Sequence, residues 1–177
     1  MNILPLRSRF FLSGVIFLGG LSGPLRAQDQ PVDLTVKMAV QEHGGSTVQA
    51  RPTEVGLEIR AQHPGEGGRG TIGIPITPFE GPLERITYRA RGTVGHCRLG
   101  VRDSNKVVFG SEIEKPGPEL AEYSIDFGKI LGKLSASNQT PQYPLLEVVL
   151  SFRFDGVTEE SLDLADVTLH RPQEPSQ

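Results

Sequence analysis

Apolar and polar residues alternate along most of this 177-residue chain, and a period of two residues predicts β-strands rather than helices. Residues 146–154 show the pattern at its longest, with an apolar residue at every second position. A strand of this kind places one face in a core and the other in solvent. The alternation predicts about nine strands, over residues 32–40, 55–62, 71–77, 85–91, 96–102, 107–109, 123–127, 146–154 and 165–170.

Turn-forming residues separate these segments, for example at 43–46, 64–68 and 115–118. Pro75 and Pro78 indicate that the strand over 71–77 lies at a sheet edge or ends early, because proline has no N–H to donate. The only segment that could form a helical turn is 127–135.

Many short strands at regular spacing are typical of a sandwich or barrel, and two packed sheets give each apolar face a partner. We therefore predict an all-β fold, a two-sheet antiparallel β-sandwich, formed by one domain over 28–171. A flexible tail should follow at 172–177.

The first 27 residues differ from the rest of the chain. Arg7 and Arg9 precede an apolar run of 12 residues at 10–21, and small or polar residues continue to Ala27. This order is typical of a signal peptide, so we predict cleavage after Ala27 and a secreted or periplasmic protein. The alternative is an uncleaved anchor, although the run is shorter than the roughly 20 residues that a membrane span needs.

Cleavage would leave 15 basic and 21 acidic residues, a net charge of −6 with histidine neutral. That charge argues against nucleic-acid binding, which needs a basic surface, and no membrane span is expected after cleavage. The single cysteine, Cys97, cannot form an internal disulfide. Cys97 alternates with Leu99 and Val101, which favours burial, whereas pairing between chains is the alternative.

Three segments in order resemble a known family. They are residues 70–76 (GTIGIPI), residues 83–92 (LERITYRARG) followed by 97–103 (CRLGVRD), and residues 164–169 (LADVTL). Together they resemble the galactose-binding-like jelly rolls, which include many carbohydrate-binding modules of exported bacterial proteins. The resemblance covers most of 32–170 and implies a jelly-roll β-sandwich.

The resemblance also implies how such a module could hold its ligands. Some members contain a structural calcium ion bound by an aspartate of the terminal strand, and Asp166 is the matching residue. Calcium takes six to eight oxygen ligands, and Asp166 is the one we can name, so a solvated or turn-bonded aspartate is the alternative. Family members usually hold sugars on Trp or Tyr rings, but this chain has no Trp. Alternation places Tyr88 and Tyr123 in the core and leaves Tyr143 near a loop.

Positive charge is concentrated in two consecutive predicted strands, 85–91 and 96–102. The basic residues there are Arg85, Arg89, Arg91, His96, Arg98 and Arg102. If the strands form a hairpin, alternation places these side chains on one face, with cross-strand neighbours about 5 Å apart. The guanidinium group binds carboxylate or sulfate through paired hydrogen bonds, so we predict one patch that binds an anionic glycan, a phosphate or an acidic protein. The alternative is ion pairing with glutamates of adjacent strands. The candidate partners are Glu54, Glu58, Glu112, Glu122 and Glu147.

Signals of catalysis are absent from the sequence. There is no GxSxG nucleophile motif, and the glycine-rich segment 65–70 leads into a strand rather than a helix, unlike a phosphate-binding loop. The four histidines lack the spacing of metal ligands; they are His43, His63, His96 and His170. A jelly-roll lyase would need a Tyr, His or Lys base, and Tyr143 and His96 are isolated.

These observations lead to two functional hypotheses. The first is an exported, non-catalytic carbohydrate-binding module that uses the arginine patch and needs no cofactor beyond the calcium at Asp166. The second is a structural or protein–protein interaction module of the cell envelope, which the low aromatic content of 6% favours slightly.

Overall fold

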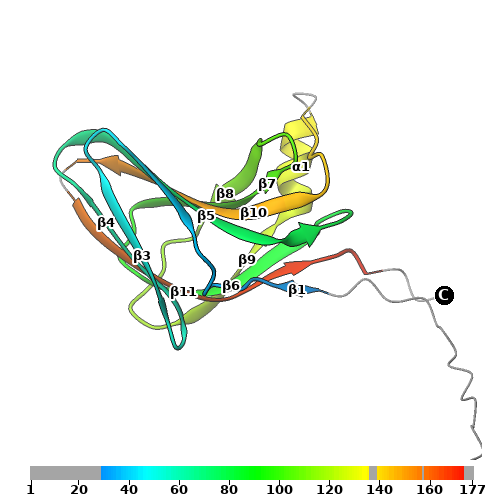
Figure 1. Cartoon of the computed structure of the whole chain (residues 1–177), viewed down its shortest axis with the longest axis horizontal. Coiled ribbons are helices and arrows are strands. Elements are labelled where there is room, and N and C mark those ends of the chain that lie inside the picture. Colours follow the sequence, from blue (N-terminus) through cyan, green and yellow to red (C-terminus); the bar gives the residue numbers. More distant parts are fainter. Residues whose placement is uncertain (1–28, 136–138, 157, 174–177) are drawn as a thin grey trace, which may run out of the picture.

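The computed structural model describes residues 29–135, 139–156 and 158–173. The predicted signal peptide at 1–27 lies outside the described residues, as does most of the predicted tail. Eleven strands of the described part form two antiparallel sheets that pack face to face (Figure 1). The prediction of an all-β sandwich is confirmed.

The first sheet, here called sheet A, has the order β3-β4-β11-β6-β9, and β1 pairs with the end of β11. Its strands are β1 (Gln30–Pro31), β3 (Thr47–Thr53), β4 (Gly56–His63), β6 (Arg85–Gly92), β9 (Ala121–Asp126) and β11 (Thr158–His170). Sheet B has the order β2-β5-β10-β7-β8. Its strands are β2 (Ala39–His43), β5 (Glu66–Phe79), β7 (His96–Asp103), β8 (Val108–Glu112) and β10 (Leu145–Asp155).

The core lies between the sheets, where the apolar positions of the alternating pattern meet. Leu150 and Phe152 of β10 belong to the same buried cluster as Leu162 and Leu164 of β11. Every phenylalanine of the described residues is buried, and Cys97 is only 2% exposed. The predicted burial of Cys97 is therefore confirmed.

The single helix of the described residues, α1 (Phe127–Ser135), occupies the segment that the sequence singled out. Asp126 caps it by accepting a hydrogen bond from the Lys129 backbone N–H at 3.0 Å. This bond, more than the side-chain contact with Lys129, lowers the pKa of the Asp126 carboxyl.

The predicted strand over 32–40 is wrong for most of its length. Asp33 Oδ1 accepts hydrogen bonds from both the backbone N–H and the hydroxyl of Thr35, and these bonds form a turn. Val32 and Leu34 are still buried, so their apolar character reflects burial in the core rather than a strand. Conversely, the pattern missed β3, which contains Pro52 and has one buried residue, Val48.

The prediction that Pro75 marks an edge strand is also wrong, because β5 lies between β2 and β10. Its neighbour β2 pairs only with residues 69–73 of β5. Pro75 and Pro78 follow that stretch, where β5 has no partner on the β2 side. Proline is tolerated there because no ladder hydrogen bond is lost on that side.

The predicted hairpin of 85–91 with 96–102 does not form. β6 belongs to sheet A and β7 to sheet B, and the chain crosses between the sheets at Val94, which is buried. Before the crossing, the Thr93 N–H donates to the Ser161 carbonyl of β11 at 2.8 Å. Alternation is the same for strands that pair and strands that cross over, so the sequence pattern could not distinguish the two.

Candidate functional site

The six residues of the predicted arginine patch are divided between opposite faces of the sandwich. Arg85, Arg89 and Arg91 lie on β6 of sheet A, whereas the other three lie on β7 of sheet B. The prediction of a single patch is therefore wrong, because it depended on the hairpin. The two outer faces must be considered as separate candidate sites.

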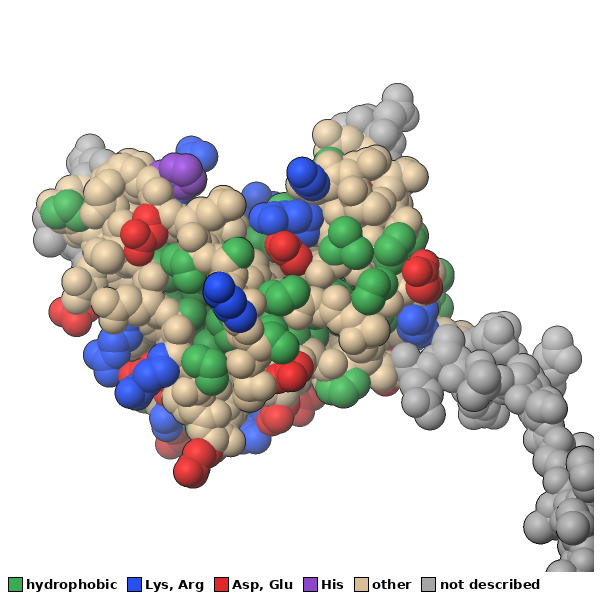
Figure 2. Space-filling view, in the orientation of Figure 1, with side chains coloured by type: hydrophobic (Ala, Val, Ile, Leu, Met, Phe, Trp, Pro, Cys, Tyr) green, Lys and Arg blue, Asp and Glu red, His purple; other side chains and the backbone are tan. Residues whose placement is uncertain are grey.

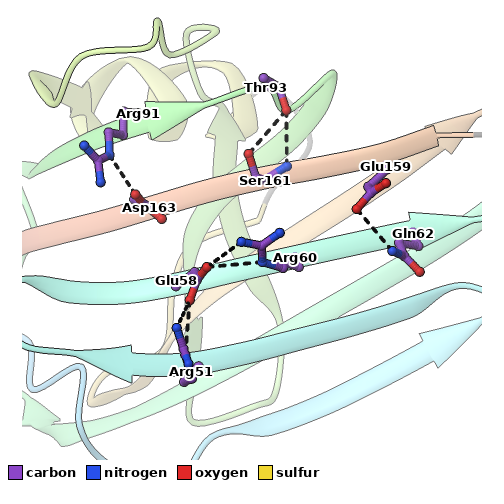
Figure 3. Close-up of polar contacts among 9 residues, drawn as sticks. All are labelled: Arg51, Glu58, Arg60, Gln62, Arg91, Thr93, Glu159, Ser161 and Asp163. Carbon is purple, nitrogen blue, oxygen red and sulfur yellow. Dashed lines mark hydrogen bonds and ion pairs between the residues drawn. The ribbon is translucent and has the colours of Figure 1, made fainter.

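On the outer face of sheet A, positive charges are paired with acids (Figure 3). Arg91 Nε lies 2.7 Å from Asp163 Oδ2, and Arg89 Nη1 lies 3.3 Å from Asp166 Oδ2. Both acids lie on β11 rather than among the glutamates that the sequence nominated. Arg85 is exposed opposite Asp126, whose carboxylate contacts Lys129.

A second ionic group on this face joins β3 and β4. Both oxygens of the Glu58 carboxylate accept hydrogen bonds, Oε1 from Arg60 and Oε2 from Arg51. These bonds, with the larger contribution from Arg60, lower the pKa of Glu58. A shallow hollow of about 310 Å³ lies over the group, but the arginines there already contact a carboxylate.

Asp166, the candidate calcium ligand, lies at an irregularity of β11. The pairing of β11 with β6 shifts between Ala165 and Thr168, and Asp166 has φ of 49°. This left-handed conformation is one that aspartate adopts more readily than most residues. No group of three His, Cys, Asp or Glu side chains within the described residues could hold a metal ion. Calcium binding at Asp166 stays a prediction.

The outer face of sheet B has a different organisation, because a row across its five strands consists of one alanine, three glycines and one valine, here called the small-residue row. The cross-strand register places Ala39, Gly73, Val149, Gly100 and Gly110 side by side. Figure 2 shows the molecule hollowed on this side, between the end that carries α1 and the opposite end. The three central residues of the row are buried, and the Glu147 carboxylate lies over Gly73, so a ligand on this face would first contact the side chains that border the row.

Polar and charged residues border this small-residue row on both sides. The row on one side contains Gln41, Thr71, Ser151, Arg98 and Glu112. The row on the other side contains the polar residues Glu147 and Arg102 together with Pro75 and Val108. Hydrogen-bond donors and acceptors are thus available on both sides of the row, as specific polar recognition requires.

Of the two arginines in these bordering rows, Arg98 has no acidic partner in the described residues. Its Nη2 donates to the Gly110 carbonyl at 2.9 Å, and Glu112, opposite in register, instead contacts His96. Arg102 Nη1, by contrast, lies 2.7 Å from Glu147 Oε2. The sequence-based alternative of pairing with Glu147 is therefore correct for Arg102.

His96 lies at the far end of the same face, beside two carboxylates. Its Nε2 is 3.1 Å from Asp155 Oδ2 and its Nδ1 is 3.5 Å from Glu112 Oε1. Arg153 hydrogen-bonds to Asp155 and, with a smaller contribution from His96, lowers the pKa of that carboxyl. Each ring nitrogen of His96 thus contacts a different carboxylate.

No aromatic side chain of the described residues is exposed. Tyr88 is buried and stacks on Tyr123 with ring centroids 5.6 Å apart. Burial raises the pKa of Tyr88. The Tyr143 hydroxyl accepts the Leu83 N–H at 3.2 Å. Tyr123 and Tyr143 are half-buried, and the other Phe and Tyr side chains of the described part are buried.

No family model and no curated protein matches this sequence, but the fold resembles solved structures. A family 30 carbohydrate-binding module of a Clostridium thermocellum cellulosomal cellulase matches with a TM-score of 0.57 and 7% identity. The match covers 83% of this chain and 99% of that one. The chain therefore has the jelly-roll β-sandwich fold that this module also has.

A family 11 module of another cellulosomal cellulase of the same organism matches with a TM-score of 0.53 and 10% identity, over 85% of this chain and 98% of the module. A family 11 module from Clostridium thermocellum in complex with a β-1,3-1,4-mixed-linked tetrasaccharide also matches, with a TM-score of 0.52 and 10% identity, over 80% of this chain and 94% of that one. A β-1,2-glucanase from Parabacteroides distasonis matches with a TM-score of 0.55 and 12% identity, over 78% of this chain but only 24% of the enzyme. The predicted resemblance is confirmed.

In the described residues, no helix has the length and apolar character to cross a membrane.

Asp103, which ends β7 in one of the resembling segments, is buried and accepts the N–H groups of Val107 and Gln142. It therefore anchors the β7–β8 turn to the segment before β10 rather than facing a ligand.

Proposed function

We propose that this protein is an exported, non-catalytic carbohydrate-binding module that binds an acidic glycan across the outer face of sheet B. The observation that carries the proposal is the small-residue row bordered by Arg98, a guanidinium group with no carboxylate partner in the described residues. The fold supports the proposal, because this chain matches two carbohydrate-binding modules over 98% and 99% of their length.

Charge favours an acidic rather than a neutral ligand on this face. Its strands carry four outward arginines, which are Arg69, Arg98, Arg102 and Arg153. Among the described side chains, three acids accompany them, namely Glu112, Glu147 and Asp155. The described side chains of this face thus include one more arginine than acid, on a protein whose predicted mature form is acidic. A uronate or sulfate group can form two hydrogen bonds with the Arg98 guanidinium.

The lack of an exposed aromatic ring defines how such a ligand would be held. Without stacking, affinity must come from hydrogen bonds to Thr71, Ser151 and their neighbours, together with the charge of Arg98. Charge-assisted hydrogen bonds are about twice as strong as neutral ones. An anionic sugar is therefore a better match for this face than a neutral glucan.

The test is binding of the purified chain to an array of uronate, sulfated and neutral glycans. We expect retention of an acidic glycan, and a loss of at least tenfold in affinity for Arg98→Gln. The matched control is Arg89→Gln, which removes an equally charged residue from the opposite face. The proposal fails if no glycan binds, or if the two variants lose affinity equally.

The interaction-module alternative is favoured by one observation. Val40 of β2 and Val108 of β8 are 41% and 44% exposed, and both lie on edge strands of sheet B. Exposed edge strands can pair with another chain. A stable dimer in light scattering, disrupted by Val40→Lys or Val108→Lys, would support this function over the first.

A further inference from the structure

A second hollow lies on the outer face of sheet A, on the opposite side of the sandwich from the proposed glycan face. Its volume is about 440 Å³, which lies in the range of small-molecule sites. It is lined by Arg91 and Gly92 at the end of β6, by the following Thr93, by Ser161 and Asp163 of β11, and by the loop 116–118.

Backbone hydrogen bonds fix the shape of this hollow. The Gly92 N–H donates to the Gly117 carbonyl at 2.9 Å and holds the loop against β6, while the Thr93 N–H bonds to Ser161. Gly92 has φ of 147°, and a Cβ atom there would lie 3.0 Å from Leu162 Cα. Glycine thus permits the close approach of β6 and β11, and the site is formed before any ligand arrives.

Two polar pairs line the hollow, and Figure 3 shows Arg91 bonded to Asp163 and Thr93 bonded to Ser161. Arg91 and Asp163 share a bond between Nε and Oδ2, at 2.7 Å. Within the described residues, the Arg91 Nη atoms and Asp163 Oδ1 have no other polar partner. Thr93 Oγ1 accepts the Ser161 N–H at 3.3 Å and lies 3.4 Å from Ser161 Oγ, where either hydroxyl can be the donor, so the pair leaves one hydroxyl proton for a ligand.

The hollow over Glu58 lacks this combination. There both carboxylate oxygens already accept bonds from guanidinium groups, so no strong acceptor remains for a ligand. At the Arg91–Asp163 pair, the Arg91 Nη groups can still donate and Asp163 Oδ1 can still accept, since neither has another polar partner within the described residues. A sugar hydroxyl accepts one hydrogen bond and donates another, and adjacent hydroxyls on a pyranose can satisfy both partners.

We propose that this hollow is a second site that binds a neutral pyranose through adjacent hydroxyl groups. The Arg91–Asp163 pair has no net charge, and a carboxylate or sulfate placed there would face Asp163, so a neutral sugar is favoured. Pro116 and Pro118 supply apolar walls. The inference extends the proposed glycan-binding function, because two sites on opposite faces would let one molecule join two glycan chains.

The test is saturation-transfer NMR and calorimetry of the purified chain with the methyl glycosides of glucose, galactose and mannose. We expect at least one glycoside to bind, and Asp163→Asn and Thr93→Val each to weaken its binding at least tenfold. Thr93→Val keeps the shape of the side chain and the backbone bond to Ser161. The matched control is Asp166→Asn, which changes the carboxylate of the neighbouring ion pair on the same two strands.

Failure of all three glycosides to bind the unaltered protein would overturn the proposal. Binding that is equally strong in Asp163→Asn and Thr93→Val would overturn it too. Arg98→Gln separates the two sites, because it should abolish acidic-glycan binding and leave glycoside binding unchanged. Loss of one activity with retention of the other therefore identifies which of the two proposed sites is wrong.

Discussion

The two outer faces of this sandwich contain similar residues but differ in what is free to bind a ligand. On sheet A, cross-strand register places Arg91 opposite Asp163, and the charges form ion pairs. On sheet B, register aligns Gly73, Gly100 and Gly110, and Arg98 has no carboxylate partner in the described residues. The comparison shows that strand register, more than residue content, determines which arginines have a carboxylate partner.

The most damaging change to this comparison is Gly100→Val. A Cβ at Gly100 would lie 2.6 Å from Gly110 Cα, and backbone cannot move aside as a side chain can. We expect the free energy of unfolding to fall by about 3 kcal/mol, measured by urea denaturation. Gly117→Ala is the control on the sheet A side, where a Cβ meets open space, and should change stability by less than about 0.5 kcal/mol.

Gly73→Leu tests the small-residue row itself. The nearest atom to a Cβ at Gly73 is Glu147 Oε2 at 2.8 Å, the end of a flexible side chain, so folding should be largely retained. The added side chain should fill the row and weaken acidic-glycan binding at least tenfold in calorimetry. Unchanged affinity in a folded variant would show that the row is not the binding surface.

A labelling control accompanies this variant. Burial raises the pKa of the Cys97 thiol, and the reactive species is the thiolate. Labelling of Cys97 by a maleimide should therefore be slow in the folded protein and fast in urea. The same slow rate in Gly73→Leu would confirm that it is folded.

Salt should separate the two proposed sites by a smaller amount. Binding of an acidic glycan to sheet B should weaken severalfold between about 0.05 and 0.5 M NaCl, because exposed charges are screened. Binding of a neutral glycoside near Arg91 should change little, since that ligand carries no charge. Calorimetric titrations at both salt concentrations give the measurement, and equal salt dependence would contradict the assignment of ligands to faces.

The smallest effect is expected from Glu58→Gln, because exposed ion pairs contribute little to stability. The pKa of Glu58 is lowered in the folded state from its ordinary value of 4.5. Its contribution is therefore fully present above pH 4.5 and is lost as the pH falls through the lower, folded-state pKa. Urea denaturation from pH 7 to about pH 3 should show the two proteins converging, whereas a constant difference would contradict this account.

The sequence by itself determined which residues form the core and which segments form most of the strands. Alternation identified β6, β7 and β10 and the burial of Tyr88 and Cys97, because the two-residue period of a strand directly reports which side chains face inward. The same local logic identified α1. It failed at 32–38, where Val32 and Leu34 are apolar because the core needs them, while Asp33 turns the chain.

Only the tertiary structure decided which strands are neighbours and in what register. β6 and β7 are consecutive and similarly patterned, yet they lie in different sheets because the chain crosses over at Val94. This crossover places Arg91 and Arg98 in different sheets. As a result, Asp163 lies beside Arg91, and the glycine row lies beside Arg98. Pairing between distant strands depends on the packing of the whole core, which no local pattern contains.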